Sequence, residues 1–270
     1  MRIRAWFVAG TLVATLSACS GPAGPAAQVP DTVEGSSSTS STGQPSRARP
    51  LAGRTIVIDP GHQVGNRNFP AQINALVDIG GSRKPCNTTG TATDDGYPEA
   101  TLTWQVARSL TRRLEKLGAT VVLTRSSNSA RKWGPCVDVR GRAGNRIGAD
   151  LKLSIHADGS LSRGAHGFHV IAPRRSAAQK PQVQARSLRL AKQVRAALRH
   201  ERLPAANYIA GGDGLDVRGD LGTLNLAKMP TVMVELGNMR SAADAARMTR
   251  KVGRERYARA LTRAIRSHLG

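Results

Sequence analysis

The sequence predicts one α/β domain over residues 54–270, with helices flanking a mixed but mostly parallel central sheet. Two observations predict this fold class. Short apolar runs of strand length alternate along the chain with longer amphipathic segments of helical period, and no internal repeat interrupts the order. Strands that alternate with helices are typical of a mostly parallel sheet. The segment is long enough for one well-formed core and too short for two.

The first half of the domain is expected to contain three strands and two helices. RTIVID (54–59) is a strand because apolar residues run together in it, and 61–98 is a long irregular segment rich in Gly, Asn, Thr and Pro. Residues 98–118 form a helix that has Pro at its start, an apolar stripe along one face and Gly at its end. The remaining elements are the strand ATVVLTR (119–125), a short helix over 137–149 and the strand LKLSIHA (151–157).

The second half begins with the strand GFHVIA (167–172). The link to it from the preceding strand is too short for a helical crossover, so we expect these two strands to run antiparallel. A helix around 182–200, a Gly- and Asp-rich loop over 211–220 and the strand TVMVELG (231–237) follow. The chain finishes with helical sequence from 241 to 268, and we expect a break near Gly253.

The N-terminus is typical of an exported protein. Residues 1–19 place Arg2 and Arg4 before an apolar run that is too short for a transmembrane helix and closes with small residues. The closing LSAC (16–19) resembles the lipobox of bacterial lipoproteins, in which the cysteine is acylated after cleavage. Cys19 is therefore a candidate lipidation site that would anchor the protein to the outer face of the cytoplasmic membrane. The alternative is an ordinary signal peptide with a chance cysteine.

Residues 20–53 are rich in Gly, Pro, Ser and Thr and nearly free of large apolar side chains. Such a composition cannot bury a core, so we interpret the segment as a disordered tether with a reach of roughly 30 Å. A tether of this length would lift the domain off a membrane and into an overlying polymer.

The chain is strongly basic, with a net charge of +22. Aromatic residues make up only 3% of it, too few for base stacking, and the export signal argues against nucleic acid as a partner. In a cell envelope the same charge favours anionic polymers and lipid head groups.

Cys86 and Cys136 remain once Cys19 is set aside. An even pair in an exported protein favours a disulfide, and neither cysteine belongs to a C-x-x-C pair of the kind that binds zinc. The alternative is two free, buried thiols.

Three predicted strands end in polar residues that an apolar core would exclude. They present His62, His156 and Glu235, and Glu99 opens the helix after the long loop. Reactive groups gather beyond the carboxyl ends of strands in such sheets, and two histidines with one carboxylate are typical ligands of catalytic zinc. Each residue alone also has a structural explanation, as a turn histidine, a glutamate that complements the helix dipole, or a glutamate paired with an arginine.

Five segments follow one another through the domain: IVIDPGH, PEATLTWQVARSL, GATVVLTR, VDVRGRAGNRIGADLKLSIHAD and PTVMVELGN. In this order they resemble the zinc-dependent N-acetylmuramoyl-L-alanine amidases of the amidase-3 family. The resemblance implies that His62, Glu99 and His156 bind one Zn²⁺ and that Glu235 is the catalytic acid/base. It also implies hydrolysis, in peptidoglycan, of the amide between the lactyl group of N-acetylmuramic acid and L-alanine of the stem peptide, by water that zinc activates.

Three further residues are candidate contacts to the substrate or the transition state. Arg140 matches an arginine upstream of the SIH strand in the family, although a structural salt bridge explains it equally well. His169 could line the cleft from its strand, and Asn225 stands where many members carry a basic residue. Asp158 and Asn238 also depart from the common asparagine and aromatic residue, which leaves the substrate contacts open while the implied reaction class is retained.

We therefore expect a monomeric, membrane-tethered amidase that acts on muramyl peptides of the cell envelope. Two alternatives stay open. One is another zinc hydrolase that acts on cell-wall peptides or on N-acetyl groups. The other is a wall-binding lipoprotein that kept the fold without catalysis.

Overall fold

The computed structural model describes residues 49–174 and 179–270. The predicted signal peptide, Cys19 and most of the predicted tether lie outside these residues. Residues 47–270 form one compact unit. Leu51 is buried in its core, and the Leu51 N–H donates to the carbonyl oxygen of Leu117. Residues 49–53, which the sequence assigned to the tether, are thus part of the folded unit.

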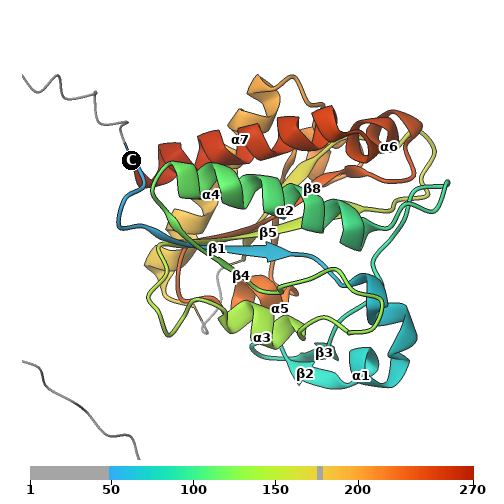
Figure 1. The fold of residues 1–270 in the computed structure, drawn as a ribbon, viewed down its shortest axis with the longest axis horizontal. Helices are drawn as coiled ribbons and strands as arrows, with labels where there is room; N and C mark the ends of the chain where they lie inside the picture. Colours follow the sequence, from blue (N-terminus) through green and yellow to red (C-terminus); the bar gives the residue numbers. More distant parts are fainter. Residues whose placement is uncertain (1–48, 175–178) are drawn as a thin grey trace, which may run out of the picture. The chain divides into compact units, whose positions relative to one another are not determined.

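A six-stranded mixed sheet forms the centre of the domain (Figure 1). Its strands lie in the order β4-β1-β5-β8-β6-β7; the first four are parallel to one another, and β6 and β7 run the other way. This mixed, mostly parallel sheet confirms the predicted fold class. The strands are β1 Thr55–Pro60, β4 Thr120–Leu123, β5 Leu151–Asp158, β6 His169–Pro173, β7 Leu215–Arg218 and β8 Thr231–Asn238.

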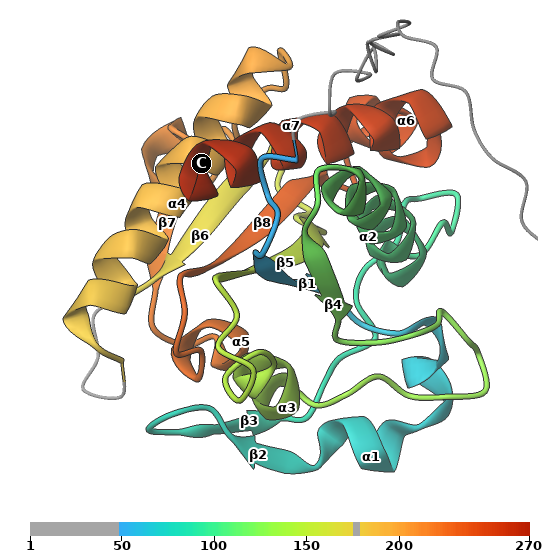
Figure 2. The same cartoon turned by 60° about the vertical axis from the view of Figure 1, so that its left-hand side comes forward.

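Helices cover the two faces of the sheet unequally (Figure 2). One face carries three long helices with a shorter one beside them: α2 Glu99–Lys116, α4 Pro181–His200, α7 Lys251–Leu269 and α6 Ala242–Thr249. The other face carries two short helices, α3 Val137–Arg142 and α5 Gly222–Asn225. The loops contain the 3-10 turns η1 Val64–Asn68 and η2 Ala210–Gly212 and the helix α1 Pro70–Asn74.

The larger core lies between the sheet and the long helices. The apolar stripe of α2 is fully buried there at the predicted positions Leu102, Val106, Leu110 and Leu114. Each such side chain contributes roughly 1.5–3 kcal/mol by leaving water. Side chains alternate along β8, so Val232 and Val234 join this core while Met233 and Glu235 face the side of α3 and α5.

Two segments contain more regular structure than the sequence indicated. The long segment after β1 includes α1 and a hairpin of β2 Leu76–Asp78 and β3 Arg83–Pro85. The loop expected over 211–220 includes β7, which pairs with β6 at the edge of the sheet. These strands are only three or four residues long, too short for a period of two to be visible.

Two further expectations need correction in detail. β6 does run opposite to β5, but the two are not neighbours, because β8 lies between them and pairs with both. The C-terminal helical sequence breaks at Arg250, whose backbone is extended, and not at Gly253. Gly253 lies in the first turn of α7, where a Cβ atom would come within 1.8 Å of the Arg247 carbonyl oxygen.

Candidate metal centre and active site

Two histidines and one carboxylate converge at the carboxyl edge of the sheet. His62 follows β1, Glu99 opens α2 and His156 lies near the end of β5. His156 Nδ1 is 3.0 Å and His62 Nε2 is 3.3 Å from Glu99 Oε1, and the ligand atoms of all three lie within 4.8 Å of one another. The structure therefore brings together the three residues that the sequence indicated as ligands, in a largely buried cluster.

The backbone around the cluster leaves room only for glycine at two positions. A Cβ atom on Gly61 would lie 2.4 Å from the His156 ring, and one on Gly90 would lie 2.8 Å from Glu99 Oε2. His62 itself has a left-handed backbone, with φ of 57°, and its Nδ1 is 3.1 Å from the carbonyl oxygen of Thr88. Nδ1 also lies 3.2 Å from the Thr88 hydroxyl oxygen, so Thr88 holds the ring with Nε2 directed toward Glu99.

A buried ion pair between Arg140 and Asp59 contacts the His156 ring. Arg140 of α3 donates to both carboxylate oxygens of Asp59, at 2.8 and 3.0 Å, and its Nη2 also lies 3.0 Å from His156 Nε2. Arg140 thus makes the salt bridge considered from the sequence and contacts a candidate ligand as well. Burial alone would raise the pKa of Asp59, but Arg140 and the hydroxyls of Ser154 and Thr124 outweigh it and hold this pKa well below its usual range.

Two more buried cations, which sequence reasoning missed, hold the backbone around the site. Lys152 Nζ donates to two carbonyl oxygens of α3, at 3.1 and 2.6 Å, and burial lowers its pKa to about 7. Arg125 donates to the carbonyl oxygens of Gly61 and Ala100, which joins the end of β1 to the start of α2. Burial lowers the pKa of Arg125 to about 9. A lysine inside an otherwise apolar strand was the one signal that pointed to Lys152.

Glu235 lies beside the cluster on β8, between two histidines. Strand register places it opposite His156 of β5 on one side and opposite His169 of β6 on the other. Its Oε2 atom is buried and has no hydrogen-bond partner among the described residues. Burial raises the pKa of Glu235 well above its ordinary value, and the negative charges of Glu99 and Asp158 raise it further. This carboxyl group therefore binds a proton more readily than an exposed glutamate.

The other two candidate contacts have different surroundings. His169 is buried beside Glu235; its ring packs edge-to-face on Tyr208, and its Nδ1 has no partner within the described part of the chain. Burial lowers the pKa of His169, which favours the neutral ring. Asn225 is buried in α5, where its amide donates to the carbonyl oxygen of Ile79 in the hairpin and to a carbonyl before α5. The Asn225 amide therefore links two loops by hydrogen bonds, and Asn225 is not among the residues that line the cleft.

A cleft of about 240 Å³ opens over these groups. The side chains of His62, His156, Arg140 and Glu235 line it together with residues of the hairpin and of α5. Across one side of it, Lys84 of β3 donates to Asp220, which precedes α5, at 2.8 Å. The cleft therefore exposes His62, His156 and Glu235 to one bound molecule.

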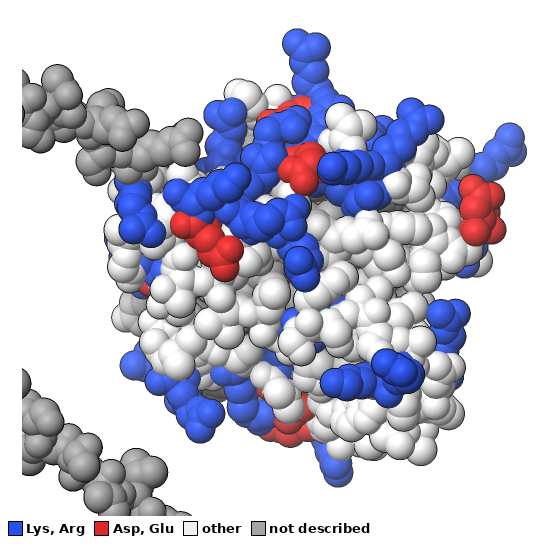
Figure 3. All heavy atoms as spheres, viewed as in Figure 1, with Lys and Arg blue, Asp and Glu red and all other residues white. Residues whose placement is uncertain are grey.

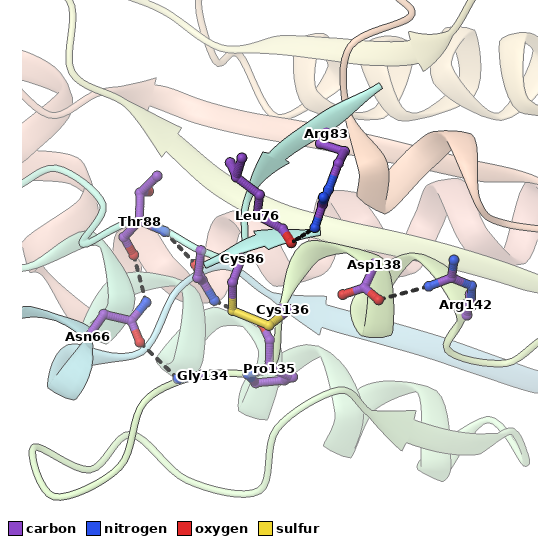
Figure 4. The surroundings of a disulfide bond; sticks show 11 residues. Asn66, Leu76, Arg83, Cys86, Thr88, Gly134, Pro135, Cys136, Asp138 and Arg142 are labelled. Atoms are coloured by element: carbon purple, nitrogen blue, oxygen red, sulfur yellow. Dashed lines mark hydrogen bonds and ion pairs between the residues drawn. A yellow bond between two sulfur atoms is a disulfide. The ribbon is translucent and has the colours of Figure 1, made fainter. Parts of the chain in front are cut away.

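A disulfide joins Cys86, which follows β3, to Cys136, which precedes α3 (Figure 4). This confirms the pairing that the sequence favoured. Close to it, the Asn66 side chain donates to the Thr88 carbonyl oxygen at 2.6 Å and accepts from the Gly134 N–H at 2.8 Å. A covalent bond therefore joins the end of the hairpin to the start of α3, and Asn66 of η1 links the segment after Cys86 to the segment before Cys136.

Known proteins are similar to this chain in sequence and in fold. Residues 56–267 match the family Amidase_3, described as N-acetylmuramoyl-L-alanine amidase. The chain is 42% identical over 223 residues to the N-acetylmuramoyl-L-alanine amidase Rv3717 of Mycobacterium tuberculosis, covering 81% of this chain and 88% of that protein. The fold is similar to crystal structures of the N-acetylmuramyl-L-alanine amidase Ami1 from two further species. For Mycobacterium smegmatis the TM-score is 0.75 at 38% identity, over 82% of this chain and 98% of that one. For the apo form from Mycobacterium abscessus the TM-score is 0.76 at 43% identity, over 82% and 100%.

Proposed function

The chain belongs to the Amidase_3 family and is an N-acetylmuramoyl-L-alanine amidase, and we propose that it works with one Zn²⁺ and with Glu235 as acid/base. Its substrate is peptidoglycan, so it acts in the cell envelope. The bond that it hydrolyses is the amide between the lactyl group of N-acetylmuramic acid and L-alanine of the stem peptide.

The chemistry of the donor set fits zinc. Two imidazoles and one carboxylate form the protein part of catalytic zinc sites that keep a fourth position open, whereas Ca²⁺ and Mg²⁺ prefer oxygen ligands. Burial would raise the pKa of Glu99, but His62 and His156 outweigh it and keep this carboxylate ionised. Burial lowers the pKa of His156, which favours the neutral ring that binds a metal. Hence His62, Glu99 and His156 would hold the ion.

Glu235 carries out the two proton transfers of the hydrolysis. When bound, zinc acts as a Lewis acid that polarises the scissile carbonyl and makes water a stronger nucleophile near neutral pH. Glu235 accepts a proton from the attacking water and gives it to the nitrogen of L-alanine as that nitrogen leaves. The products are the lactyl carboxylic acid and a stem peptide with a free amine. The raised pKa of Glu235 suits a group that must both accept and release a proton in one turnover.

Several neighbours position these groups. Arg140 and Asp59 hold the His156 ring in one orientation, and Lys152 holds the helix that carries Arg140. Arg140 also lines the cleft, which supports it as a donor to a substrate oxygen. His169 is adjacent to Glu235 across the strand pair, which supports a role in orienting that carboxyl group.

The attachment of the protein is proposed from its N-terminal sequence. We propose that Cys19 is acylated, that the segment between Cys19 and residue 49 serves as the tether and that the protein is monomeric. Among residues 49–174 and 179–270, no helix is long and apolar enough to cross a membrane.

One observation supports the proposed mechanism most directly. Three ligand atoms of the zinc-binding type converge at the cleft, directly beside a glutamate whose pKa is raised. Other zinc hydrolases of cell-wall peptides or N-acetyl groups would share this arrangement, so the bond that is cleaved separates them from an amidase. A wall-binding protein without catalysis would not need Glu235.

The test is digestion of muramyl dipeptide and of wall fragments by residues 47–270, with the products identified by mass spectrometry. We expect release of intact stem peptide with a free L-alanine amine. Glu235→Gln and a chelated sample should yield none, and added Zn²⁺ should restore activity only to the chelated one. Cleavage at a different bond would identify another zinc hydrolase. A folded, zinc-loaded domain that cleaves nothing would identify a binding protein.

A further inference from the structure

The three long helices present a strongly basic surface. Together α2, α4 and α7 carry fifteen Lys and Arg residues but only three acidic residues, of which Glu99 is buried in the active site. Figure 3 shows basic side chains gathered over the upper part of this view, where α7 and α2 lie, with few acidic ones between them. We call the exposed surface of these three helices the basic face.

Acidic residues near the basic face link its helices and leave most of the cations unpaired. Glu255 of α7 pairs with two arginines of α2, and Glu201, after α4, pairs with two arginines of α7. Arg195 of α4 pairs with Asp213. The other ten cations have no carboxylate within 4.0 Å in the described part of the chain: Arg108, Lys116, Arg186, Arg189, Lys192, Arg199, Lys251, Arg254, Arg263 and Arg266.

We propose that the basic face lies on an anionic lipid bilayer. Its helices are 18, 20 and 19 residues long, and α7 packs between α2 and α4. The face is therefore roughly 30 Å long and contacts several head groups at once. Cations close to an anionic membrane surface attract it additively and lose that attraction as salt screens them. A broad group of unpaired cations fits such a surface.

The cleft lies on the other side of the sheet. Its lining comes from α3, α5, the hairpin and the strand ends, and β8 separates the two sides, with Val234 toward the helices and Glu235 toward the cleft. A polymer bound along the basic face would therefore lie behind the sheet from Glu235. This position argues against the face as a substrate site. On a bilayer it would instead turn the cleft away from the lipid, toward the wall.

The chain enters the domain at the edge of the same face. The Leu51 N–H donates to the carbonyl oxygen of Leu117 at the end of α2, and Arg54 donates to that of Leu269 at the end of α7. The first described residues thus lie beside the basic face, and the proposed tether would be attached there. A lipid anchor and a polybasic surface reinforce each other, because an acyl chain alone gives weak attachment.

The test is binding of residues 47–270, which form a compact unit without the proposed anchor, to lipid vesicles in 0.1 M salt. Vesicles with phosphatidylglycerol are compared with vesicles of phosphatidylcholine alone. One variant replaces Arg189, Lys192, Arg263 and Arg266 by Gln. The matched control replaces four exposed cations outside these helices by Gln: Arg67, Arg131, Lys132 and Arg146. Hydrolysis of soluble muramyl dipeptide is measured in parallel and should be equal in all three proteins. Absence of hydrolysis would count against the proposed function and would be distinguished from a loss of vesicle binding.

We expect binding to the anionic vesicles only, a loss of at least tenfold in the basic-face variant and less than threefold in the control. Equal losses in both variants would overturn the proposal, because they would show that net charge and not this face is responsible. Absence of binding to anionic vesicles would also overturn it. Binding to purified wall sacculi that the basic-face variant loses, without vesicle binding, would show that the partner is a wall polymer.

Discussion

In the proposed mechanism, Glu235 and its charged neighbours determine the chemistry at the scale of single residues. Its buried Oε2 atom has no partner among the described residues, and two negative groups, Glu99 and Asp158, lie close enough to raise its pKa after burial has done so. The same low-polarity surroundings favour the neutral ring of His169 beside it. A carboxyl group in this position binds a proton more readily than an exposed glutamate does.

Asp158→Asn tests this electrostatic account through the pH dependence of kcat/KM on muramyl dipeptide. Glu235 acts as a base only when ionised, and its raised pKa moves the acidic limb of the profile to higher pH. Removing the negative charge of Asp158 makes ionisation of Glu235 easier, so the limb should move to lower pH.

Tyr208→Phe is the matched control, because Tyr208 donates to Asp158 at 2.9 Å and its loss leaves the charge in place. The acidic limb of the pH profile of Tyr208→Phe should not move to lower pH. An Asp158→Asn profile whose acidic limb stays in place, or moves to higher pH, would show that Glu235 is not the titrating base.

The sequence indicated a site residue only where the features that mark it are close to it in the chain. Strand-end residues such as His62 and His156 stand out because they follow apolar runs directly. Arg140 and Asp59 are 81 residues apart, and nothing local shows that they meet. Asn225 was considered as a substrate contact from its place in the family pattern, but its amide partner, Ile79, lies 146 residues away.

At the scale of elements, the turn after β1 and the start of α2 are packed so closely that small residues are required. Gly61 lies against the His156 ring and Gly90 against Glu99 and His62. Arg125 closes the same corner by donating to the backbone of both elements. The ligands are thus positioned by backbone packing as well as by their own hydrogen bonds.

Gly61→Ala should weaken metal binding, since a Cβ atom 2.4 Å from the His156 ring forces that ring to move. We expect a loss of roughly 10- to 100-fold in zinc affinity, the range found when the support of a ligand is disturbed. Competition with a chromophoric chelator measures it. Gly219→Ala is the control, because the nearest atom to its Cβ is at an ordinary contact distance of 3.4 Å. Unchanged zinc affinity in Gly61→Ala would contradict the packing argument.

The double variant Cys86→Ala/Cys136→Ala tests the link between the hairpin and α3. The bond spans 50 residues, so on the chain-entropy account its loss should destabilise the domain by about 4 kcal/mol. For a domain of this size that corresponds to a decrease in Tm of roughly 8–16 °C, measured by calorimetry. An equal Tm for the double variant and the parent would show that the hydrogen bonds around Asn66 hold the two segments without the disulfide.

The sequence predicted the long elements better than the short ones. The leucine and valine spacing of α2 and the apolar run of β8 extend over enough residues to show their period. The strands β2, β3 and β7 contain only three or four residues. They form because β2 pairs with β3 and β7 pairs with β6, and no local sequence pattern predicts such pairing. At the break, Arg250 has an extended backbone between α6 and α7, which contact each other.

At the scale of the whole molecule, the sheet separates the candidate active site from the basic face proposed to bind lipid. Its parallel strands carry His62, His156 and Glu235 to one edge, and the reversed β6 brings His169 to the same edge. The long helices behind the sheet supply most of the core and the basic face. Alternation of helices and strands predicted this architecture. It did not predict that β8 would lie between β5 and β6, because pairing between strands distant in sequence depends on the assembled core.

Stability of the whole domain should depend on pH through Lys152. Its folded-state pKa of about 7 lies below the ordinary value of 10.5, so between these pH values the unfolded chain binds more protons than the folded one. The free energy of unfolding therefore gains a contribution that rises with pH across this window, by up to a few kcal/mol. Urea denaturation of the parent and of Lys152→Met at pH 6.5, 8 and 9.5 measures it. The difference between the two should change with pH; parallel curves would contradict the burial of a charged lysine.

Metal binding and proton transfer are assigned to different residues, and zinc content measured together with turnover tests this division of roles. The parent domain, Glu235→Gln and His156→Ala are each assayed for zinc per chain and for hydrolysis of muramyl dipeptide. We predict that Glu235→Gln retains one zinc and loses activity by roughly 10²- to 10⁴-fold, while His156→Ala loses both. Glu235→Gln with parental turnover, or without zinc, would contradict this division of roles.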